Sequence, residues 1–339
     1  MNETWQVFSR GQQSSLRGRE VWRDGNVLID LSELALVRVS GTDAKNFLNG
    51  QFTNDIQRVD AARAQLSAWC TAQGRMLAVM RVMEYDGAYL LQLSASLREE
   101  FIKRLRMYVL RAKVVVEDAS AEIVSFGVVG PDAERLLSDV GGALPRQIDD
   151  VATLGGSRIV RVPGVHPRFI VIAPVSEAIA LWDKLRSQFA ITGFDAWAWH
   201  DIVAGVPTVT PATREAFVPQ MANLELIGGV NFKKGCYPGQ EIVARMQYLG
   251  RLKQRMYRAH SAGDPPLAGT AIFTPSTEQS VGTVVDARPS PDGGSDMLAV
   301  VQIAAVEAGN LHLGDVNGTS VSASPPPYSF DLAQAQKVS

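Results

Sequence analysis

Residues 39–48, VSGTDAKNFL, have a counterpart in residues 129–137, VGPDAERLL. In both stretches an extended run passes through a glycine into a helix that an aspartate opens. The proline of the second copy suits a first helical turn, where its missing N–H costs nothing. Each copy is followed by further strand-like runs and another amphipathic helix. The repetition therefore predicts an α+β body built from two pseudo-duplicated halves.

Turn and helix signals after the first copy support this fold class. Two apolar runs, residues 76–84 and 89–93, flank Asp86-Gly87, a pair that tolerates the positive φ angles of a type I′ turn. A β-hairpin is predicted there. Apolar residues at four-residue spacing then predict an amphipathic helix over residues 97–109.

The pattern changes near residue 250. Short β-branched runs, such as residues 283–285 and 298–303, are separated by clusters of Gly, Pro and Asp, which predicts a small all-β barrel or sandwich. The expected organisation in chain order is a polar arm (1–20), a body (21–245) with halves at 30–118 and 120–245, a C-terminal barrel (250–330) and a tail (331–339).

The composition narrows the class of protein. Of the 339 residues, 46% are hydrophobic and 20% are charged, values typical of a globular protein. The formal net charge of −2 gives no global attraction to nucleic acid or anionic lipid, so any basic site must be local. The first 20 residues contain no apolar stretch, and no apolar run reaches membrane length. We therefore expect a cytoplasmic protein with no membrane partner.

The metal-ligating side chains are few and scattered. Cys70 and Cys236 are too few for a disulfide scaffold, and no CxxC pair exists that could hold zinc or a cluster. The four histidines show no ligand spacing. We expect a reducing compartment and no permanently bound metal.

The densest chemical signal is FKKGCYPGQE, residues 232–241. Pro238-Gly239 fits the two central positions of a type II turn, which predicts that Cys236 lies on a tight, exposed loop. Lys234, two residues earlier, is suitably placed to stabilise a thiolate. The alternative is a cysteine packed as a small buried hydrophobe, and the pattern leaves both readings open.

A local excess of positive charge begins at the same place. Residues 233–258 contain one acid, Glu241, and seven basic residues: Lys233, Lys234, Arg245, Arg251, Lys253, Arg255 and Arg258. Such a stretch can receive phosphates, including those of tRNA, a polyglutamate tail or an acidic partner. The competing interpretation is the solvated face of a hairpin.

Two tryptophans, Trp197 and Trp199, stand beside His200-Asp201. An indole offers a flat face on which a planar ligand can stack, although core packing explains at least one of them as well. Consecutive residues of a helix face different directions, which argues against acid–base work by His200 and Asp201 as a pair.

Several motifs in the same order resemble the YgfZ-type folate-binding proteins, which are relatives of the T-protein of the glycine cleavage system. KGCYPGQE, residues 234–241, resembles their K-G-C-Y-x-G-Q-E signature. The likeness extends to residues 47–55 (FLNGQFTND), 74–77 (GRML), 204–207 (AGVP), 217–220 (FVPQ) and 223–224 (NL).

The resemblance implies two ferredoxin-like halves and a C-terminal barrel, with tetrahydrofolate in a central opening. It also implies a role in making or repairing iron–sulfur clusters, and through those clusters in tRNA modification. The expected partners are folate and iron–sulfur client enzymes or assembly proteins.

The family's functional residues map onto this sequence position by position. The key cysteine falls on Cys236 and the key lysine on Lys234. The rest of the functional motif comprises Gly235, Tyr237, Gly239, Gln240, Glu241 and Arg245. The tryptophan that lines the folate pocket falls on Trp197, and a second aromatic contact of some relatives falls on Leu34, which removes a stacking face.

A further departure argues against the T-protein reaction. T-proteins carry an aspartate that polarises the folate nitrogen just after the position of residues 74–77, and an arginine in place of Trp197. Here that aspartate position holds Ala78 and Val79, which cannot accept a proton. We therefore do not expect aminomethyl transfer by that mechanism.

Three functional hypotheses follow. In the leading one, an accessory protein binds tetrahydrofolate against Trp197, with Gln51 and Arg75 as polar contacts and Cys236 as the functional thiol. The second is a folate-dependent one-carbon transferase or demethylase that uses another acid, such as Glu241 or Asp55. The third is a direct tRNA-binding module that uses the basic residues of 233–258.

Overall fold

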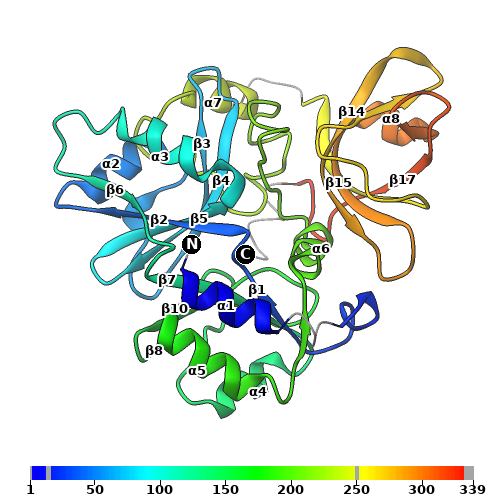
Figure 1. Ribbon diagram of the computed structural model, residues 1–339. Helices are drawn as coiled ribbons and strands as arrows, with labels where there is room; N and C mark the ends of the chain where they lie inside the picture. Colours follow the sequence, from blue (N-terminus) through cyan, green and yellow to red (C-terminus); the bar gives the residue numbers. More distant parts are fainter. Residues whose placement is uncertain (1, 13–16, 249–251, 332–339) are drawn as a thin grey trace. The chain divides into compact units, whose positions relative to one another are not determined.

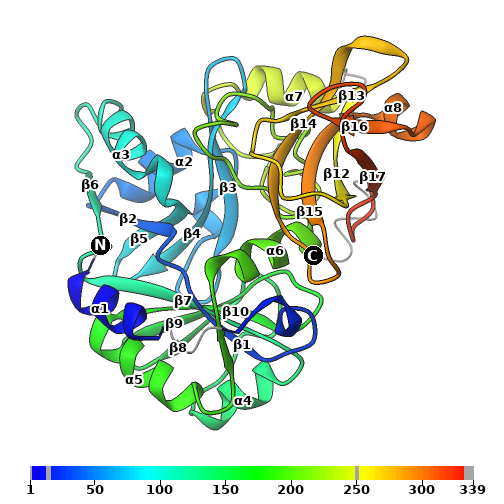
Figure 2. The same cartoon turned by 45° about the vertical axis from the view of Figure 1, so that its right-hand side comes forward.

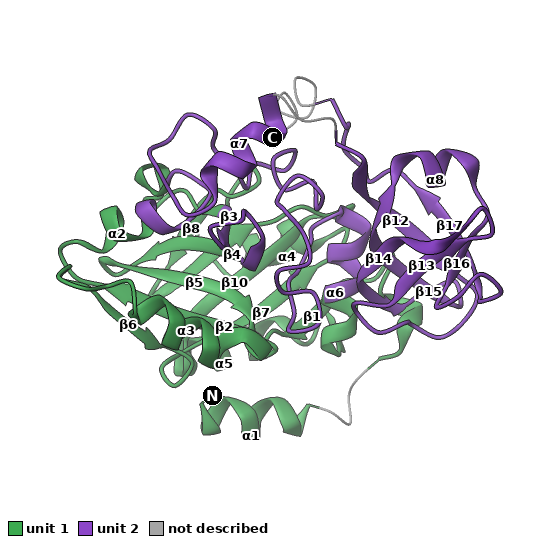
Figure 3. Ribbon diagram, turned by 90° about the horizontal axis from the view of Figure 1, so that it is seen from above, with its two compact units in different colours: residues 1–48, 56–65, 80–197 green, residues 49–55, 66–79, 198–339 purple. Residues whose placement is uncertain are grey.

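The computed structural model describes residues 2–12, 17–248 and 252–331 (Figure 1). The chain divides into two compact units, which Figure 3 colours separately. Unit 1 consists of residues 1–48, 56–65 and 80–197, and unit 2 of residues 49–55, 66–79 and 198–339. Each unit therefore draws on stretches that are far apart in the sequence.

A six-stranded sheet of order β11-β1-β7-β10-β9-β8 lies in unit 1. Its strands are β1 (Val27–Asp30), β7 (Ile123–Val129), β8 (Val151–Leu154), β9 (Ser157–Arg161), β10 (Arg168–Pro174) and β11 (Ala190–Thr192). Neighbouring strands are antiparallel, except that β1 pairs with β11 in parallel. Several strands that are neighbours in the sheet, such as β1 and β11, are far apart in the chain. Helices and loops that cross the faces of the sheet connect them.

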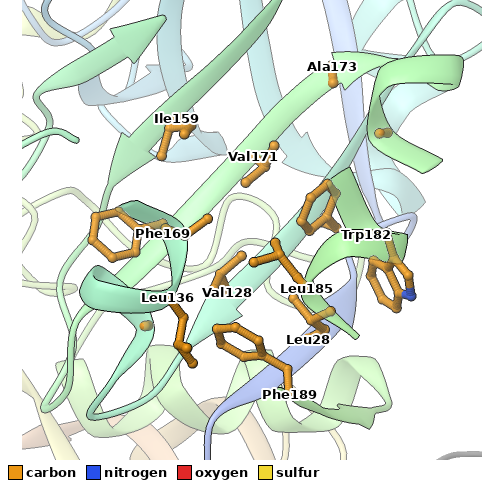
Figure 4. Packing of buried hydrophobic residues seen from close by; sticks show 14 of the residues in the cluster. Leu28, Val128, Leu136, Ile159, Phe169, Val171, Ala173, Trp182, Leu185 and Phe189 are labelled. Carbon is orange, nitrogen blue, oxygen red and sulfur yellow. The ribbon is translucent and has the colours of Figure 1, made fainter. Parts of the chain in front are cut away.

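One face of this sheet is covered by helices, as Figures 1 and 2 show. These are α1 (Glu3–Gly11), α4 (Ala133–Asp139) and α5 (Val175–Leu185). Because alternate residues of a strand point to the same face, Phe126 and Val128 join Phe169 and Val171 in one apolar cluster. Trp182 of α5 packs on the same cluster (Figure 4). This face is the hydrophobic core of unit 1.

The N-terminus differs from the expected polar arm. Residues Glu3–Gly11 form helix α1, which Asn2 caps by accepting a hydrogen bond from the Trp5 N–H. The Trp5 side chain is fully buried, and its indole N–H donates to Asp30 at 2.9 Å. The prediction of a loose arm was wrong because polar neighbours surround the few apolar residues that make this helix amphipathic.

A second sheet has the order β3-β4-β5-β2-β6. Its strands are β2 (Leu34–Ser40), β3 (Gln65–Cys70), β4 (Met76–Tyr85), β5 (Ala88–Ser94) and β6 (Val115–Asp118), and its helices are α2 (Ala44–Gln51) and α3 (Arg98–Arg106). The hairpin between β4 and β5 turns at Asp86 and Gly87, whose φ angles are 50° and 77°. The hairpin prediction is confirmed, with the positive φ angles that a type I′ turn requires. Three short 3-10 turns, Arg19–Val21, Ile56–Arg58 and Ala95–Leu97, complete this part of the chain.

A glycine makes the turn from strand to helix in both repeated stretches, residues 39–48 and 129–137. Gly41 lies between β2 and α2 with φ 114°, and Gly130 lies between β7 and α4 with φ 146°. A β-carbon would lie 2.1 Å from the Lys113 carbonyl oxygen at the first position and 2.3 Å from Asn26 at the second. Both strand-to-helix turns therefore require glycine, which supports a structural duplication.

The C-terminal strands of unit 2 form a closed barrel of order β12-β15-β14-β13-β16-β17. They are β12 (Gln254–Ser261), β13 (Ala271–Thr274), β14 (Thr277–Pro289), β15 (Ser295–Gln302), β16 (Leu311–Leu313) and β17 (Ser320–Ser324). Pairing of β17 with β12 closes the ring, so the barrel form of the prediction is confirmed over the sandwich. Helix α8 (Ile303–Ala308) lies between β15 and β16 in the chain. Helices α6 (Phe194–Ala204) and α7 (Gln240–Tyr248) come before the first strand of the barrel.

Two expectations about the chain's organisation are not tested by this fold. The boundaries of the body, its two halves and the barrel domain stay predictions, and most of the predicted tail lies outside the described residues. Within the part of the chain that the structure describes, no helix is both long enough and apolar enough to span a membrane.

Candidate functional site

The two cysteines differ sharply in their surroundings. Cys70 is buried at the end of β3, and this burial raises the pKa of its thiol. Cys236 is exposed on the loop before α7. The buried-hydrophobe interpretation thus fits Cys70, whereas Cys236 is presented at the surface, as its glycine and proline neighbours predict.

Lys234 anchors this loop to the end of α2. Its half-buried ammonium group donates hydrogen bonds to the carbonyl oxygens of Asn49 and Phe52, the latter at 2.6 Å. The last carbonyls of a helix lack intrahelical partners and carry partial negative charge, so a cation is favourable there. The ammonium group also lies 5.1 Å from the ring centre of Tyr237. Lys234 therefore holds the loop in place, and its effect on the Cys236 thiolate stays a prediction.

Burial lowers the pKa of Lys234 to about 8, although the nearby negative charge of Asp55 acts in the opposite direction. The adjacent Tyr237 is itself buried, with only 6% of its surface exposed. Burial, assisted by the charge of an ionised Cys70, raises the pKa of the Tyr237 hydroxyl. The ring of Tyr237 thus packs the loop against the protein, whereas Gly235 and Cys236 are exposed to solvent.

The second half of the motif packs on the turn between β3 and β4. Gly239 has φ 82°, as the glycine of a type II turn requires. A β-carbon on Gly239 would lie 2.3 Å from the carbonyl oxygen of Thr71 and 2.7 Å from Gly74. A β-carbon on Gly74 would in turn lie 3.1 Å from the Ile242 side chain of α7. The motif therefore fits against residues 71–74 through direct backbone contact.

Thr53 and Asn54 form the third anchor of the site. The Thr53 hydroxyl donates to the carbonyl of Gly229 at 2.7 Å, and the Asn54 amide donates to that of Gly228 at 2.7 Å. The Thr53 carbonyl in turn accepts from the Asn231 N–H at 3.0 Å. Both side chains are buried, so these bonds fix the chain that leads into the motif. Both residues belong to the predicted motif of residues 47–55, but nothing local identifies their partners, which lie more than 170 positions away.

These anchors bring three distant segments of unit 2 together: residues 49–54, 71–75 and 228–242. Gln51 and Arg75, the two predicted polar contacts of folate, belong to the first two segments. The amide oxygen of Gln51 is buried, and among the described residues it accepts no hydrogen bond. Arg75 is exposed, and its guanidinium donates to the carbonyl of Ala216.

The other residues of the motif lie on α7. Gln240, Glu241 and Arg245 lie within its first six positions. The Gln240 N–H donates to the Tyr237 carbonyl at 3.2 Å, so the helix begins directly at the turn. Glu241 and Arg245 are exposed.

The remaining two predicted folate contacts belong to unit 1. Trp197 is only 2% exposed, and its indole packs on Gly127 of β7. The guanidinium of Arg168 lies 3.6 Å from the ring centre and donates to the Trp197 carbonyl. Leu34 lines a pocket of about 20 Å³, which is sufficient for a water molecule but not for a pterin. Ligand contact by Trp197 or Leu34 stays a prediction.

The basic stretch is partly engaged within unit 2. Lys234 is bound to α2, and Arg255 forms an ion pair with the buried Glu225. Burial raises the pKa of Glu225, although Arg255 acts to lower it. Arg251 lies outside the described residues. The stretch therefore presents fewer cations than its composition predicts.

Trp199 belongs to a hydrogen-bonded chain that continues through Asp296 to His260. The indole of Trp199 donates to Asp296 at 2.7 Å, and a ring nitrogen of His260 lies 2.8 Å from the other carboxylate oxygen. Burial acts to raise the pKa of Asp296, but hydrogen bonds from Trp199, His260 and Ser290 outweigh it and lower the pKa. His200 is buried in α6. Within the described residues, no group of three or more His, Cys, Asp or Glu side chains is arranged to hold a metal ion.

Comparison with known proteins identifies relatives over nearly the whole chain. Residues 6–165 match the family model of the GCVT N-terminal domain. The tRNA-modifying protein YgfZ of Sodalis glossinidius (strain morsitans) is 32% identical over 307 residues, which cover 89% of this chain and 93% of that protein. The protein of the same name from Klebsiella pneumoniae (strain 342) is 30% identical over 317 residues, covering 90% and 94% of the two chains.

A solved structure supports the fold. The glycine cleavage system aminomethyltransferase T from Bartonella henselae superposes with a TM-score of 0.75, covering 94% of this chain and 89% of that one. Its sequence identity is 17%, so this likeness concerns the fold alone. The predicted fold class, a mixed α+β body with a C-terminal barrel, is confirmed.

Proposed function

The chain belongs to the family of the tRNA-modifying protein YgfZ, and on this premise we propose that it is a tetrahydrofolate-binding accessory protein of iron–sulfur metabolism. In this role it assists the assembly or repair of clusters in client enzymes and thereby supports tRNA modification. Cys236 supplies the functional thiol. The observation that carries the proposal is the exposure of Cys236 on a loop that a half-buried lysine and a glycine-dependent turn hold in place.

The polar groups near the loop suit a folate. The buried amide oxygen of Gln51, which accepts no hydrogen bond from the described residues, matches an N–H donor of a pterin. Arg75 is exposed and has five N–H donors, of which its bond to Ala216 engages one, so it can bind the glutamate carboxylates. When bound, tetrahydrofolate would supply one-carbon chemistry.

A single thiol limits what Cys236 can do. Iron–sulfur clusters in proteins are generally held by four ligands, so one cysteine does not hold a cluster by itself. An exposed thiol can, however, serve as a temporary ligand that is shared with a client, or act on a damaged centre. Lys234 acts as a positioning residue in this proposal, because its ammonium group is bonded to the end of α2.

The test uses a strain that lacks this gene and measures a cluster-dependent tRNA modification, such as methylthiolation. Cys236→Ala and Lys234→Ala should both lower the modification. Cys70→Ala removes the buried cysteine and should not lower it, and Lys233→Ala removes the adjacent exposed cation with the same expected result. Full restoration by Cys236→Ala would show that the thiol has no such role.

Folate binding is tested separately by titrating purified protein with tetrahydrofolate while following tryptophan fluorescence. Gln51→Ala and Arg75→Ala should each weaken binding, whereas Arg146→Ala, an exposed arginine of unit 1, should not. Equal affinity in wild type and both site variants would remove the folate assignment from these residues.

A further inference from the structure

A strongly basic segment lies in unit 1, outside the site described above. Residues 103–113, the end of α3 and the turns that follow it, contain no acid and five basic residues: Lys103, Arg104, Arg106, Arg111 and Lys113. All of these except Arg104 are exposed. We call this segment the basic turn. In a chain of net charge −2, it is a local concentration of positive charge that the overall composition does not reveal.

The basic turn is held in a defined conformation. Backbone hydrogen bonds join Met107 to Arg104 at 3.2 Å and Ala112 to Val109 at 2.8 Å. The Lys113 N–H donates to the Asp43 carboxylate at 2.8 Å, and Arg106 donates to the Val116 carbonyl at 2.8 Å. A partner would therefore meet an ordered backbone and an ordered Arg106 guanidinium, which reduces the entropic cost of binding.

Large apolar and aromatic side chains are exposed among these cations. Met107 is 62% exposed, Tyr108 is 42% exposed and Leu110 is 89% exposed. Leu110 also has φ 46°, an unfavourable backbone angle for a residue with a side chain. An exposed tyrosine ring offers a face on which a base can stack, and the aliphatic side chains can pack beside it.

A hollow of about 420 Å³ lies against α3 and shares residues with the basic turn. It is lined by Arg98, Glu99, Ile102, Lys103, Arg106 and Asp118. Ile102 provides an apolar surface, Arg106 provides a planar guanidinium, and Glu99 provides a carboxylate that accepts hydrogen bonds. This combination suits a planar heterocycle that carries N–H donors and is attached to an anionic group.

From this arrangement we propose that the basic turn and the adjoining hollow form a binding site for RNA with unpaired nucleotides, such as the loops or the 3′ end of a tRNA. The exposed cations contact phosphates, and one unpaired base enters the hollow and hydrogen-bonds to Glu99. The choice of tRNA rests on the proposed function, whereas the site itself rests on the geometry of unit 1.

Two observations favour RNA at this site. The hollow combines cations that suit a phosphate with the Glu99 carboxylate, which can accept a hydrogen bond from a base, whereas Asp118 forms an ion pair with Arg98. A nucleotide carries both an anion and a donor-bearing base, and an acidic protein surface offers only the anion. The basic residues of 233–258 are the competing site, but Lys234 and Arg255 are engaged within unit 2.

The test is fluorescence anisotropy of the full-length protein with a fluorescein-labelled, unmodified tRNA transcript at about 0.1 M NaCl. Arg111→Glu should weaken binding about tenfold and lower the slope of log Kd against log salt by about one. Arg146→Glu reverses an exposed arginine elsewhere in unit 1 and should change neither quantity. Glu99→Ala should weaken tRNA binding without lowering the salt slope, because it removes the hydrogen-bond acceptor for the base and not a phosphate contact.

Three results would overturn this site. The first is that the wild type does not bind the transcript, and the second is that Arg111→Glu and Arg146→Glu lose equal affinity for it. The third is a loss of affinity confined to Lys233→Glu and Arg258→Glu, which would place the contact at 233–258. A blunt RNA duplex of similar length should bind more weakly than the transcript, and equal binding would exclude the base-binding hollow. The tetrahydrofolate titration of Arg111→Glu should match wild type, so failure of this inference and failure of the folate proposal are distinguishable.

Discussion

The ammonium group of Lys234 donates a hydrogen bond to the carbonyl oxygen of Phe52, 182 positions earlier in the chain, at 2.6 Å. This contact joins the two most specific motifs of the sequence, the decapeptide and the segment around residues 47–55. Lys234 therefore helps to hold the loop that carries Cys236. This anchoring role can be tested by measuring the stability of the protein without the lysine.

Removing this lysine should destabilise the fold. Lys234→Ala leaves the carbonyls of Asn49 and Phe52 without their donor, and hydrogen bonds from a charged group contribute about 1.5–3 kcal/mol each. The cost of burying the ammonium group offsets part of this gain, so we expect a net loss of about 2 kcal/mol in the free energy of unfolding, measured by urea denaturation. Lys233→Ala changes an exposed neighbour and should alter stability by less than about 0.5 kcal/mol. Equal effects would contradict the anchoring role.

The same lysine should give stability an alkaline pH dependence. Its pKa falls from 10.5 to about 8 on folding, mainly through burial, so between these values the unfolded chain binds more protons than the folded one. Stability therefore rises with pH across that window. Urea denaturation of wild type and Lys234→Met at pH 8 and pH 10 should show a larger rise in the wild type. A parallel pH dependence in the two proteins would argue against the lowered pKa.

The two thiols should differ in reactivity. Cys236 is exposed and Cys70 is buried, so iodoacetamide should modify one thiol in the native protein and two in urea. Cys236→Ser should show no rapid modification in the native state, while Cys70→Ser should keep it. Mass spectrometry of the labelled peptides identifies the residue. Rapid native labelling of Cys70 would show that the described burial does not persist in solution.

Alanine should be far more destabilising at one glycine of the motif than at the other. Gly239→Ala places a β-carbon 2.3 Å from the Thr71 carbonyl oxygen at φ 82°, so we expect about 2–4 kcal/mol of destabilisation. Gly235→Ala meets no atom within 4 Å and should be nearly neutral. Thermal unfolding of both variants tests whether the turn at Gly239 requires glycine.

The N-terminal helix should contribute to the core of unit 1. Trp5 is fully buried, so Trp5→Ala should destabilise the protein by about 3–5 kcal/mol. Val7 is 70% exposed on the same helix, and Val7→Ala should cost less than about 0.5 kcal/mol. If both variants were as stable as wild type, helix α1 would contribute nothing to the stability of the core.

The sequence predicts those parts of the fold that local patterns determine. Asp86-Gly87 specifies its own turn, and the short β-branched runs after residue 250 become the strands of the barrel. Helix α1 is missed because its apolar residues, led by Trp5, become informative only once a sheet is present for them to cover. Tertiary packing therefore decides that helix, and local propensity does not.

The candidate site divides in the same way. The exposed loop at Cys236 follows from its Gly and Pro neighbours, which act locally. The partners of Lys234 and Thr53 could not be inferred, because each contact spans more than 170 positions. Trp197 could be proposed as a folate contact, which stays a prediction, but it could not be recognised as the partner of Arg168, whose guanidinium lies over its ring.

The interleaving of the two compact units has a practical consequence for fragments. A proteolytic cut after Trp197 would leave residues 49–55 and 66–79 on the N-terminal piece, although they belong to unit 2. The C-terminal piece would then lack the carbonyls that receive Lys234 and the turn that receives Gly239. Co-expression of both pieces, rather than truncation, is therefore the route by which a split version of this protein could recover its reactive loop.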